Sequence, residues 1–194
     1  MRQPAAPNHP GTHLYGMASR MTEITAVCRR YNLKLVEDCA QSHGAYYDGR
    51  MTGTFGDIGC FSFYPSKNLG AFGEGGAIVT NNEKIAKACR SFRNYGSQKR
   101  YYNEVVGTNS RLDELQAGLL RVRLKHLDEL TQERQRIAER YTRELENPMF
   151  KKPIVADRAT SVWHQYVITC EQREELIDYL NAKEIGTIIH YPVP

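Results

Sequence analysis

Short apolar runs alternate with amphipathic segments along this chain, and this alternation constrains the fold more than any other feature. Three runs have the length and the boundaries of buried strands: 33–37, 58–63 and 77–80. Segment 22–31, just before the first run, carries apolar residues at helical spacing. Helices that alternate with short buried strands predict an α/β fold with a mostly parallel sheet flanked by helices.

Two helices are expected after the third run. An asparagine at 81 or 82 is a suitable cap for a helix that runs to about Arg93. Segment 111–146 is periodic throughout and predicts one long helix, opened by a capping box at 110–113. Pro148 lies just beyond this helix and would help to end it, because proline disfavours helix in the residue before it.

The last fifty residues predict further elements of both kinds. We expect a strand at 163–170, a helix at 171–183 and a strand at 187–190. With 194 residues, the chain has the length of one domain, or of one domain and part of another.

The charge balance argues against a nucleic-acid partner. The formal net charge is only +4. In the predicted long helix, basic residues alternate with acidic ones: Arg134, Arg136, Arg140 and Arg143 with Glu133, Glu139 and Glu144. Nucleic-acid surfaces gather charges of a single sign, so a solvated helix face explains this pattern better.

No stretch predicts a membrane span or a secretory signal. No apolar run approaches the ~20 residues of a transmembrane helix, and residues 1–12 have three prolines but no apolar core. The five cysteines are an odd number without paired spacing, so we expect reduced thiols and a cytoplasmic location. Cys39, His43 and Cys60 lack the closely paired spacing of a zinc site.

Asp38 and Lys67 are the strongest candidates for chemistry. Asp38 follows the first apolar run and Lys67 follows the second. Ligands of α/β sheets bind beyond the carboxyl ends of the strands, so both side chains are expected at one pocket. There a lysine can hold the aldehyde of pyridoxal 5′-phosphate (PLP), and a carboxylate can keep the pyridine nitrogen protonated so that the ring accepts electrons. The alternatives are a solvated surface lysine and a strand-end acid that caps a helix.

Longer motifs surround this pair and follow one another in a fixed order. They are EDCAQSHGA at 37–45, FSFYPSKNLG at 61–70, GGAI at 75–78, GTNSRLDELQA at 107–117, WH at 163–164 and HYP at 190–192. With these motifs the chain resembles the DegT/DnrJ family of nucleotide-sugar aminotransferases, which have the fold type I architecture of PLP enzymes. The resemblance runs from about His13 to Pro194.

The resemblance implies a role for each candidate. Lys67 would hold PLP as a Schiff base and then move the proton between cofactor and substrate. Asp38 would pair with the pyridinium nitrogen. Gln41 would lie near the phenolic oxygen of the ring, and Ser62 would bind the phosphate. The alternatives are a polar turn residue for Gln41 and a serine satisfied by backbone for Ser62.

Three candidates lie further along the chain. By resemblance, Asn109 would reach the phosphate of a neighbouring subunit, so that a homodimer shares its sites. It could also cap the long helix. His190 and Tyr191 would lie on the substrate side, or could serve only in aromatic–proline packing. No chemistry is assigned to His43, beside Gly44, and His164 is interpreted as structural.

The resemblance also implies a reaction. An amino group would pass from glutamate to a keto-sugar linked to a nucleotide. The residues 65–71 and 189–194 look most like those of enzymes that aminate a 3-keto-6-deoxyhexose on dTDP. A sister group that deoxygenates sugars carries histidine in place of the lysine, so Lys67 argues against it. The alternative from another class is a catalytically inactive relative that acts as a binding or regulatory protein.

The start of the chain departs from the family's pattern. The family has a long segment before the match at His13, which supplies strands and part of the cofactor pocket. We therefore expect an atypical leader at 1–12, part of the PLP-binding large domain at 13–146 and the start of a smaller C-terminal α/β domain at 147–194. A form truncated in this way would expose apolar surface and sheet edges, and could fold poorly or be inactive on its own.

Overall fold

A four-stranded sheet lies at the centre of the structure, a computed structural model that describes residues 11–193. The strands, in spatial order, are β1 (Gly11–Thr12), β2 (Val36–Asp38), β5 (Ile58–Ser62) and β6 (Gly76–Val79). The first three run parallel, and β6 is antiparallel to β5. This mostly parallel sheet confirms the predicted α/β class.

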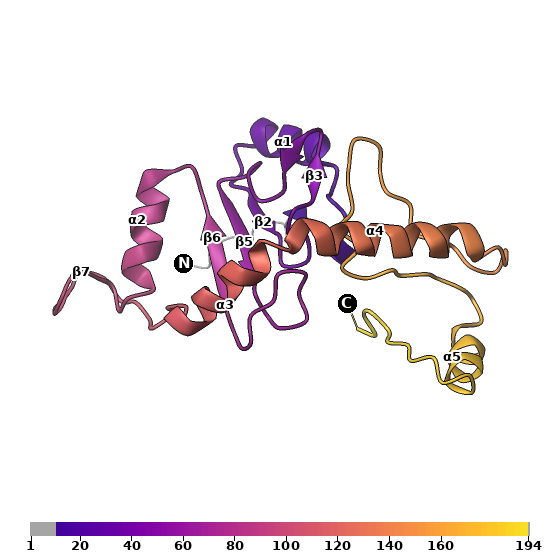
Figure 1. Ribbon diagram of the computed structural model, residues 1–194. Coiled ribbons are helices and arrows are strands. Elements are labelled where there is room, and N and C mark those ends of the chain that lie inside the picture. The colour runs from indigo at the N-terminus through magenta and orange to yellow at the C-terminus, as the bar shows by residue number, and fades with distance from the viewer. Residues whose placement is uncertain (1–10, 194) are drawn as a thin grey trace.

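Helices surround the sheet, and two small hairpins are separate from it. Figure 1 shows α1 (Met21–Arg30) over the top of the strands and α2 (Glu83–Phe92) beside β6. In the same view α3 (Glu114–Leu124) and α4 (Leu127–Glu144) cross in front. The remaining elements are η1 (Leu14–Gly16), β3 (Tyr46–Tyr47), β4 (Arg50–Met51), β7 (Ser97–Lys99), β8 (Tyr102–Asn103) and α5 (Arg173–Asn181). The β3–β4 hairpin lies near α1, and the β7–β8 hairpin lies beyond α2 (Figure 1).

The predicted strands and helices of the first half of the chain are confirmed to within a few residues. The largest difference is at β2, which begins at Val36 and not at Leu33. The Leu33 N–H still donates to a carbonyl of α1, and the Leu35 N–H donates to the Asp57 carboxylate instead of a strand. The predicted cap of α2 is Asn82, whose side chain accepts from the first backbone N–H groups of the helix.

The predicted long helix 111–146 is two helices. It begins at Glu114, and its first cap, Asp113, makes no side-chain hydrogen bond, so the predicted capping box is wrong. The break falls at Lys125 and His126, where backbone bonds tighten to the i→i+3 type. Leu120 of α3 and Leu127 of α4, on either side of the break, are buried in one cluster.

The two strands predicted near the carboxyl end are absent among residues 11–193. The alternating pattern at 163–170 yields one isolated bridge, between Lys151 and Thr169, and segment 187–190 forms none. A strand needs a neighbour that bonds its backbone groups along its length, and in the described structure 163–170 has such a bridge only at Thr169 and 187–190 has none. The helix α5 does form inside the predicted 171–183. The predicted domain boundary near residue 146 stays a prediction.

The last two residues of the predicted leader 1–12 belong to the sheet. Residues 1–10 lie outside the described residues, but Gly11 and Thr12 form β1 and pair with Glu37 and Asp38 of β2. A glycine and a threonine carry no apolar strand signal, so the pattern could not reveal this pairing.

Two clusters of buried residues hold these layers together. The first lies between α1, β2 and the β3–β4 hairpin and consists of Ala18, Met21, Leu35, Ala45, Tyr47 and Val162. The second lies between the loop after β5 and the α3–α4 junction and consists of Leu69, Ala71, Leu120 and Leu127. Both clusters lie near the loops that follow the parallel strands. Buried apolar side chains therefore pack against these loops.

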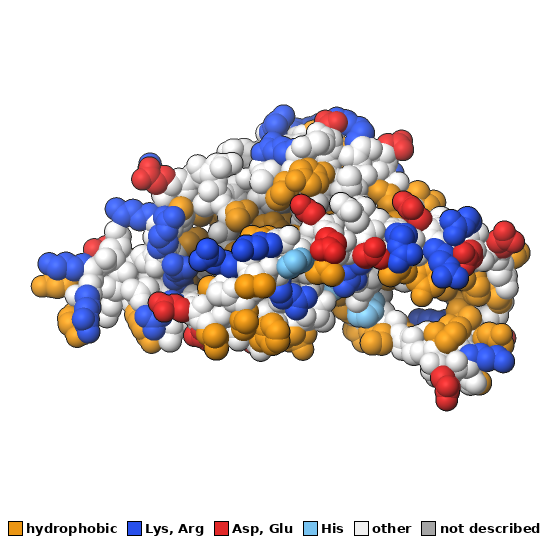
Figure 2. Space-filling model, viewed as in Figure 1, with side chains coloured by type: hydrophobic (Ala, Val, Ile, Leu, Met, Phe, Trp, Pro, Cys, Tyr) orange, Lys and Arg blue, Asp and Glu red, His pale blue; other side chains and the backbone are white. Residues whose placement is uncertain are grey.

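Mixed charges cover the exposed side of α4, as the sequence predicts. Figure 2 shows Lys and Arg side chains interleaved with Asp and Glu along this helix. Arg136 pairs with Glu133, and Arg140 pairs with Glu144. Arg134 differs from the prediction, because it is half-buried and donates to the carbonyls of Trp163 and His164. No helix among residues 11–193 has the length and apolar character that crossing a membrane requires.

Candidate functional site

The carboxyl ends of the parallel strands bring the two main candidates to one edge of the sheet. Asp38 ends β2 and pairs in register with Cys60, so β5 continues two residues further, to Ser62. The loop after Ser62 carries Lys67, whose N–H donates to the Tyr64 carbonyl at 2.9 Å. Asp38, Ser62 and Lys67 therefore lie at or beyond the carboxyl ends of neighbouring strands, where the sequence places them.

Neither charged candidate is neutralised by the other. Lys67 is half-buried, and among residues 11–193 no carboxylate lies within ion-pair distance of its ammonium. Asp38 is half-buried too, and one carboxylate oxygen accepts from the Ala40 N–H at 3.0 Å. The amine of Lys67 and the carboxylate of Asp38 lie at one sheet edge and do not pair with each other. Both groups can therefore bind a third group, such as a ligand.

Gln41 joins this edge to the carboxyl end of the chain. It is buried, its Oε1 accepts from the Tyr15 N–H at 2.6 Å and its Nε2 donates to the Tyr191 hydroxyl at 2.9 Å. The Tyr15 hydroxyl donates to the His190 carbonyl at 2.8 Å, and Gln165 Nε2 lies 2.9 Å from His190 Nε2. The structure thus brings Gln41, His190 and Tyr191 together, although they are separated by about 150 residues of chain.

Ser62 forms a local bond. Its hydroxyl oxygen accepts from the Tyr64 N–H at 3.3 Å. This bond corresponds to the alternative in which the serine is satisfied by the backbone. The hydroxyl proton of Ser62 is still free to rotate toward a ligand, because this bond uses only an oxygen lone pair.

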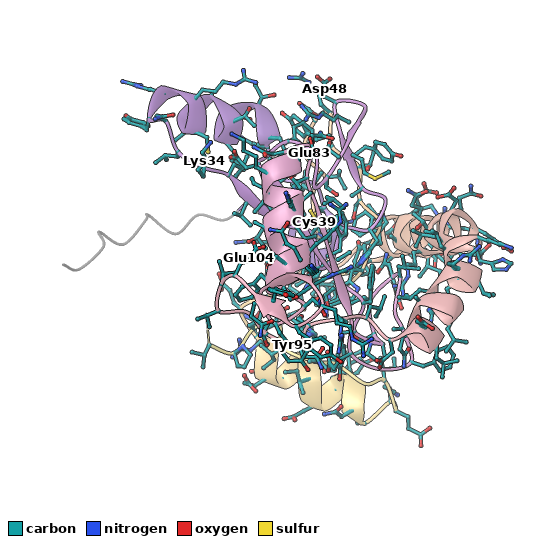
Figure 3. All side chains as sticks on the ribbon, turned by 90° about the vertical axis from the view of Figure 1, so that its left-hand side faces the viewer. Lys34, Cys39, Asp48, Glu83, Tyr95 and Glu104 are labelled. Carbon is teal, nitrogen blue, oxygen red and sulfur yellow. The ribbon has the colours of Figure 1, made fainter. Side chains whose placement is uncertain are left out.

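Asn109 lies apart from the other candidates. Its side chain is exposed and accepts from Arg111 Nε at 3.0 Å, and its backbone bridges to Asn94. It does not cap α3, because the cap position belongs to Asp113. The carbonyl of the neighbouring Thr108 accepts a hydrogen bond from the Tyr95 N–H. In Figure 3, Tyr95 lies at the lower end of α2, and Cys39 lies higher up behind that helix.

His43 is the most unusual polar residue near Lys67. It is 3% exposed and packs between Phe61 and Phe63, with ring centroids 5.4 and 6.0 Å away. Neither ring nitrogen has a hydrogen-bond partner among residues 11–193. Burial lowers the pKa of His43 to about 4, and the positive charge of Lys67 acts in the same direction. The ring is therefore neutral near pH 7.

Glu37, one residue before Asp38, organises the back of the site. The side chain has no exposed surface, and its carboxylate accepts from the N–H groups of Gly53, Phe55 and Gly56 and from His13 Nε2. Burial alone would raise the pKa of Glu37, but the bonds from His13 and the backbone outweigh it and hold the pKa below its usual value.

His13, Glu37 and Cys39 have ligand atoms within 4.8 Å of one another, but they do not form a metal site. His13 Nδ1 accepts from the Ser19 N–H at 3.1 Å, so Nε2 carries the proton that it donates to Glu37. Both ring nitrogens and both carboxylate oxygens are thus in use. Burial raises the pKa of the Cys39 thiol to about 12, so no thiolate is available either.

Sequence reasoning gave no role at the site to four residues that build this region. Tyr15 and Gln165 connect to Gln41 and His190. Asn68, the residue after Lys67, bonds His164. Asn68 and His164 lie in two of the motifs quoted above, but spacing could not show that residues 96 positions apart meet.

Known proteins resemble nearly all of this chain. The model of the DegT/DnrJ/EryC1/StrS aminotransferase family matches residues 11–194. The dTDP-3-amino-3,6-dideoxy-alpha-D-galactopyranose transaminase of Aneurinibacillus thermoaerophilus is 48% identical over 94% of this chain and 50% of its own length. The dTDP-3-amino-3,4,6-trideoxy-alpha-D-glucose transaminase of Streptomyces venezuelae is 46% identical, over 94% and 48%. The chain thus spans about half the length of the curated relatives it matches.

Solved structures agree with this assignment. Streptomyces venezuelae DesV, in complex with a ketimine intermediate, has a TM-score of 0.91 at 46% identity and covers 94% of this chain and 50% of its own. NtdA of Bacillus subtilis, with bound cofactor PMP, has a TM-score of 0.83 at 32% identity, over 94% and 43%. The match of fold and family model over residues 11–194 leads to one conclusion. The chain belongs to the DegT/DnrJ/EryC1/StrS aminotransferase family.

Proposed function

We propose that this chain supplies the catalytic lysine and most of the cofactor site of a PLP-dependent aminotransferase that acts on a nucleotide-linked keto-sugar. The observation that carries the proposal is the arrangement at the sheet edge, where Asp38 and Lys67 lie beyond neighbouring parallel strands without pairing with each other. Family membership and relatives named as dTDP-sugar 3-transaminases support the same class. We further propose a dTDP-3-keto-6-deoxyhexose as acceptor and glutamate as amino donor.

The side chains at this edge suit PLP by their chemistry. When bound, PLP supplies an aldehyde for an amine and a ring that accepts electrons. Lys67 would bind the aldehyde and afterwards act as acid and base at the substrate carbon. Asp38 would hold the proton on the ring nitrogen, and Ser62 would donate its hydroxyl to the phosphate.

The remaining candidates would orient the reactants. Gln41 would face the phenolic oxygen of the ring, and its bonds to Tyr15 and Tyr191 keep its amide fixed. His190 and Tyr191 would line the sugar side, because they return to the same edge from the end of the chain. The bonds of Gln41 thus couple the cofactor side of the site to the substrate side.

A homodimer with shared sites is part of this proposal. Asn109 is exposed, and its backbone bridges to Asn94, two residues beyond the end of α2. The β7–β8 hairpin between these two residues extends to the outer left of the molecule in Figure 1. That position is accessible to a second subunit, in keeping with a role at the partner's phosphate. The five free thiols are in keeping with a reducing cytoplasm.

The direct test is turnover by purified protein. We would incubate the protein with PLP, glutamate and either a dTDP-3-keto or a dTDP-4-keto 6-deoxyhexose, and measure the amino sugar by mass spectrometry. Amination of the 3-keto sugar is expected, and Lys67→Ala should abolish it. Lys84→Ala, at an exposed position of α2, is the matched control and should leave the rate unchanged.

The outcomes separate the parts of the proposal. Turnover of the 4-keto sugar alone would refute the proposed substrate and keep the reaction class. Turnover that survives Lys67→Ala would refute the proposed role of the lysine. An analytical sedimentation run at the assay concentration tests the dimer, because a monomer that turns over substrate would contradict shared sites.

A further inference from the structure

The loop that carries Lys67 is closed at its base. The Ala71 N–H donates to the Phe63 carbonyl at 2.7 Å, and the Lys67 N–H donates to Tyr64 inside the loop. Gly70 lies so close to the chain opposite that a Cβ there would meet the Pro65 carbonyl oxygen at 2.4 Å. The loop 63–71 is therefore compact, and Lys67 has a defined backbone position in it.

Asn68, the residue next to Lys67, ties this loop to a distant segment. It is 5% exposed, its Nδ2 donates to the Val162 carbonyl at 2.8 Å, and its Oδ1 lies 3.0 Å from His164 Nδ1. The Val162 carbonyl can only accept, so the amide nitrogen must face it and the amide oxygen must face His164. His164 therefore carries its proton on Nδ1 and keeps a lone pair on Nε2.

The segment that receives these bonds is itself fixed from other sides. The Val162 N–H donates to the Gly16 carbonyl at 2.9 Å, and Arg134 of α4 donates to the Trp163 carbonyl at 3.1 Å. Gly16 has a positive φ of 94°, and a Cβ there would lie 2.7 Å from the backbone nitrogen of His164. The two segments of backbone are therefore in contact. Segment 161–164 thus offers the Lys67 loop a rigid support.

We propose that Asn68 and His164 form a positioning pair that fixes the loop of Lys67 against segment 161–164, and so places the Lys67 amine at the edge of the sheet. The inference rests on the proposed function, which gives the Lys67 amine its role of binding the cofactor. Both residues act through Lys67 and neither needs to touch substrate. Burial lowers the pKa of His164 to about 4, with the charges of Lys67 and Arg134 acting in the same direction. The pair therefore adds no second cation beside the amine near pH 7.

A different explanation is that apolar packing alone fixes the loop. Leu69 and Ala71 are buried against Leu120 and Leu127. If this packing sufficed, removing the polar pair would leave the loop unchanged. The variants Asn68→Ala and His164→Ala break the pair and leave the apolar cluster intact. The variant His164→Asn keeps it, because the amide nitrogen of asparagine occupies nearly the place of Nδ1.

The first measurement is amide hydrogen exchange of peptides that cover 63–71. We expect exchange at least about tenfold faster in Asn68→Ala and His164→Ala, and within about twofold of wild type in His164→Asn. Ser66→Ala, at an exposed position on the other side of Lys67, is the control and should match wild type. If His164→Ala does not fold, Asn68→Ala and His164→Asn still decide the question.

The second measurement tests placement of the amine. Lysines are trapped with PLP and borohydride, and the yield at Lys67 is divided by the yield at exposed Lys87. We expect this ratio to fall at least about fivefold in Asn68→Ala and His164→Ala and to recover in His164→Asn. Nitrogen-15 shifts of the His164 ring should show the proton on Nδ1, and a proton on Nε2 would contradict the pairing.

The outcomes of the two proposals can be told apart. A wild-type ratio near one means that Lys67 is not a cofactor lysine, so the proposed function fails while the exchange data still judge the pair. A high wild-type ratio, with unchanged exchange and unchanged ratio in both alanine variants, keeps the proposed function and overturns the pair.

Discussion

The region around Glu37 and the region around α5 show two ways in which this chain orders its backbone. Glu37 is fully buried and bonds three backbone N–H groups and a histidine within one network. In α5 no residue is buried, and Figure 1 shows the helix at the far end of the molecule, away from the sheet. Beyond α5 the chain returns to the sheet edge, where bonds to Tyr15, Gln41 and Gln165 hold it.

The difference indicates where the site is rigid and where it can move. Residues on the Glu37 side are held by buried bonds that are costly to break, because each broken bond leaves a buried polar group without a partner. Residues on the α5 side are held by a few half-buried side-chain bonds. We therefore expect the cofactor side to be preformed and the substrate side, at His190 and Tyr191, to open locally at low free-energy cost.

Removing the Glu37 carboxylate should have the largest effect on this contrast. Glu37→Ala leaves His13 and three backbone N–H groups without their acceptor and should lower the free energy of unfolding by about 3–5 kcal/mol. The matched change in α5 is Glu175→Ala, at an exposed position, which should stay within about 0.5 kcal/mol of wild type. Urea unfolding measures both. Equal effects would remove the contrast between the regions.

Apolar truncation sharpens the comparison without changing charge. Met21 has no exposed surface and packs in the first cluster, so Met21→Ala should cost about 2–5 kcal/mol. Leu176 of α5 is only half-buried, and Leu176→Ala should cost under about 1 kcal/mol. The free energies of unfolding of the two variants are measured by urea melts and compared with that of wild type. A loss at Leu176 as large as that at Met21 would show that α5 is packed as part of the core.

Acid should weaken the sheet-edge region through His43. Because its pKa in the folded protein is about 4, below the ordinary 6.5, the folded state takes up this proton less readily than the unfolded state. Its contribution is complete above pH 6.5 and is lost as the pH falls toward 4. His43→Leu should therefore remove about 2 kcal/mol of the stability loss between pH 7 and pH 5.

The control for this pH effect is His126→Leu, because His126 is exposed at the α3–α4 junction. Urea midpoints at the two pH values should change in this variant as they do in wild type. If His43→Leu shows the full wild-type acid loss, the histidine ring is hydrated in solution and the site is more open than described.

The cap of α2 should give the smallest effect. Asn82 accepts from Lys84 N and Ile85 N, so Asn82→Ala should cost about 1 kcal/mol. Asn81→Ala, one residue earlier and outside the cap, should have almost no effect, and thermal melts of the two variants make the comparison. Equal melting temperatures for the two variants would mean that the cap contributes nothing measurable.

Local signals in the sequence were enough for elements that form by themselves or with near neighbours. Apolar runs located β5 and β6, and the asparagine cap located the start of α2. The strand ends then placed Asp38 and Lys67 at one edge, because parallel strands end together. The resemblance to a known family added Gln41, His190 and Tyr191, and the structure brings these three into contact.

Features that depend on partners distant in sequence could not be predicted. The pattern at 163–170 reads as a strand, but the chain there bonds loops and α4 and so is not extended beside a neighbour. The break at His126 has no sign in the periodicity, because Leu120 and Leu127 keep a spacing of seven residues that a continuous helix would also show. Asn68 and His164 lie in two separate sequence motifs, and only the fold shows that they meet.

The most direct test of the account is to find which lysine binds PLP. Purified protein is incubated with PLP, reduced with borohydride, digested and examined by mass spectrometry. The account predicts a pyridoxyl phosphate adduct concentrated on Lys67, with little on exposed Lys84 and Lys87. Adducts spread over the exposed lysines, with Lys67 unmodified in folded protein, would contradict the claim that this edge of the sheet forms the cofactor site.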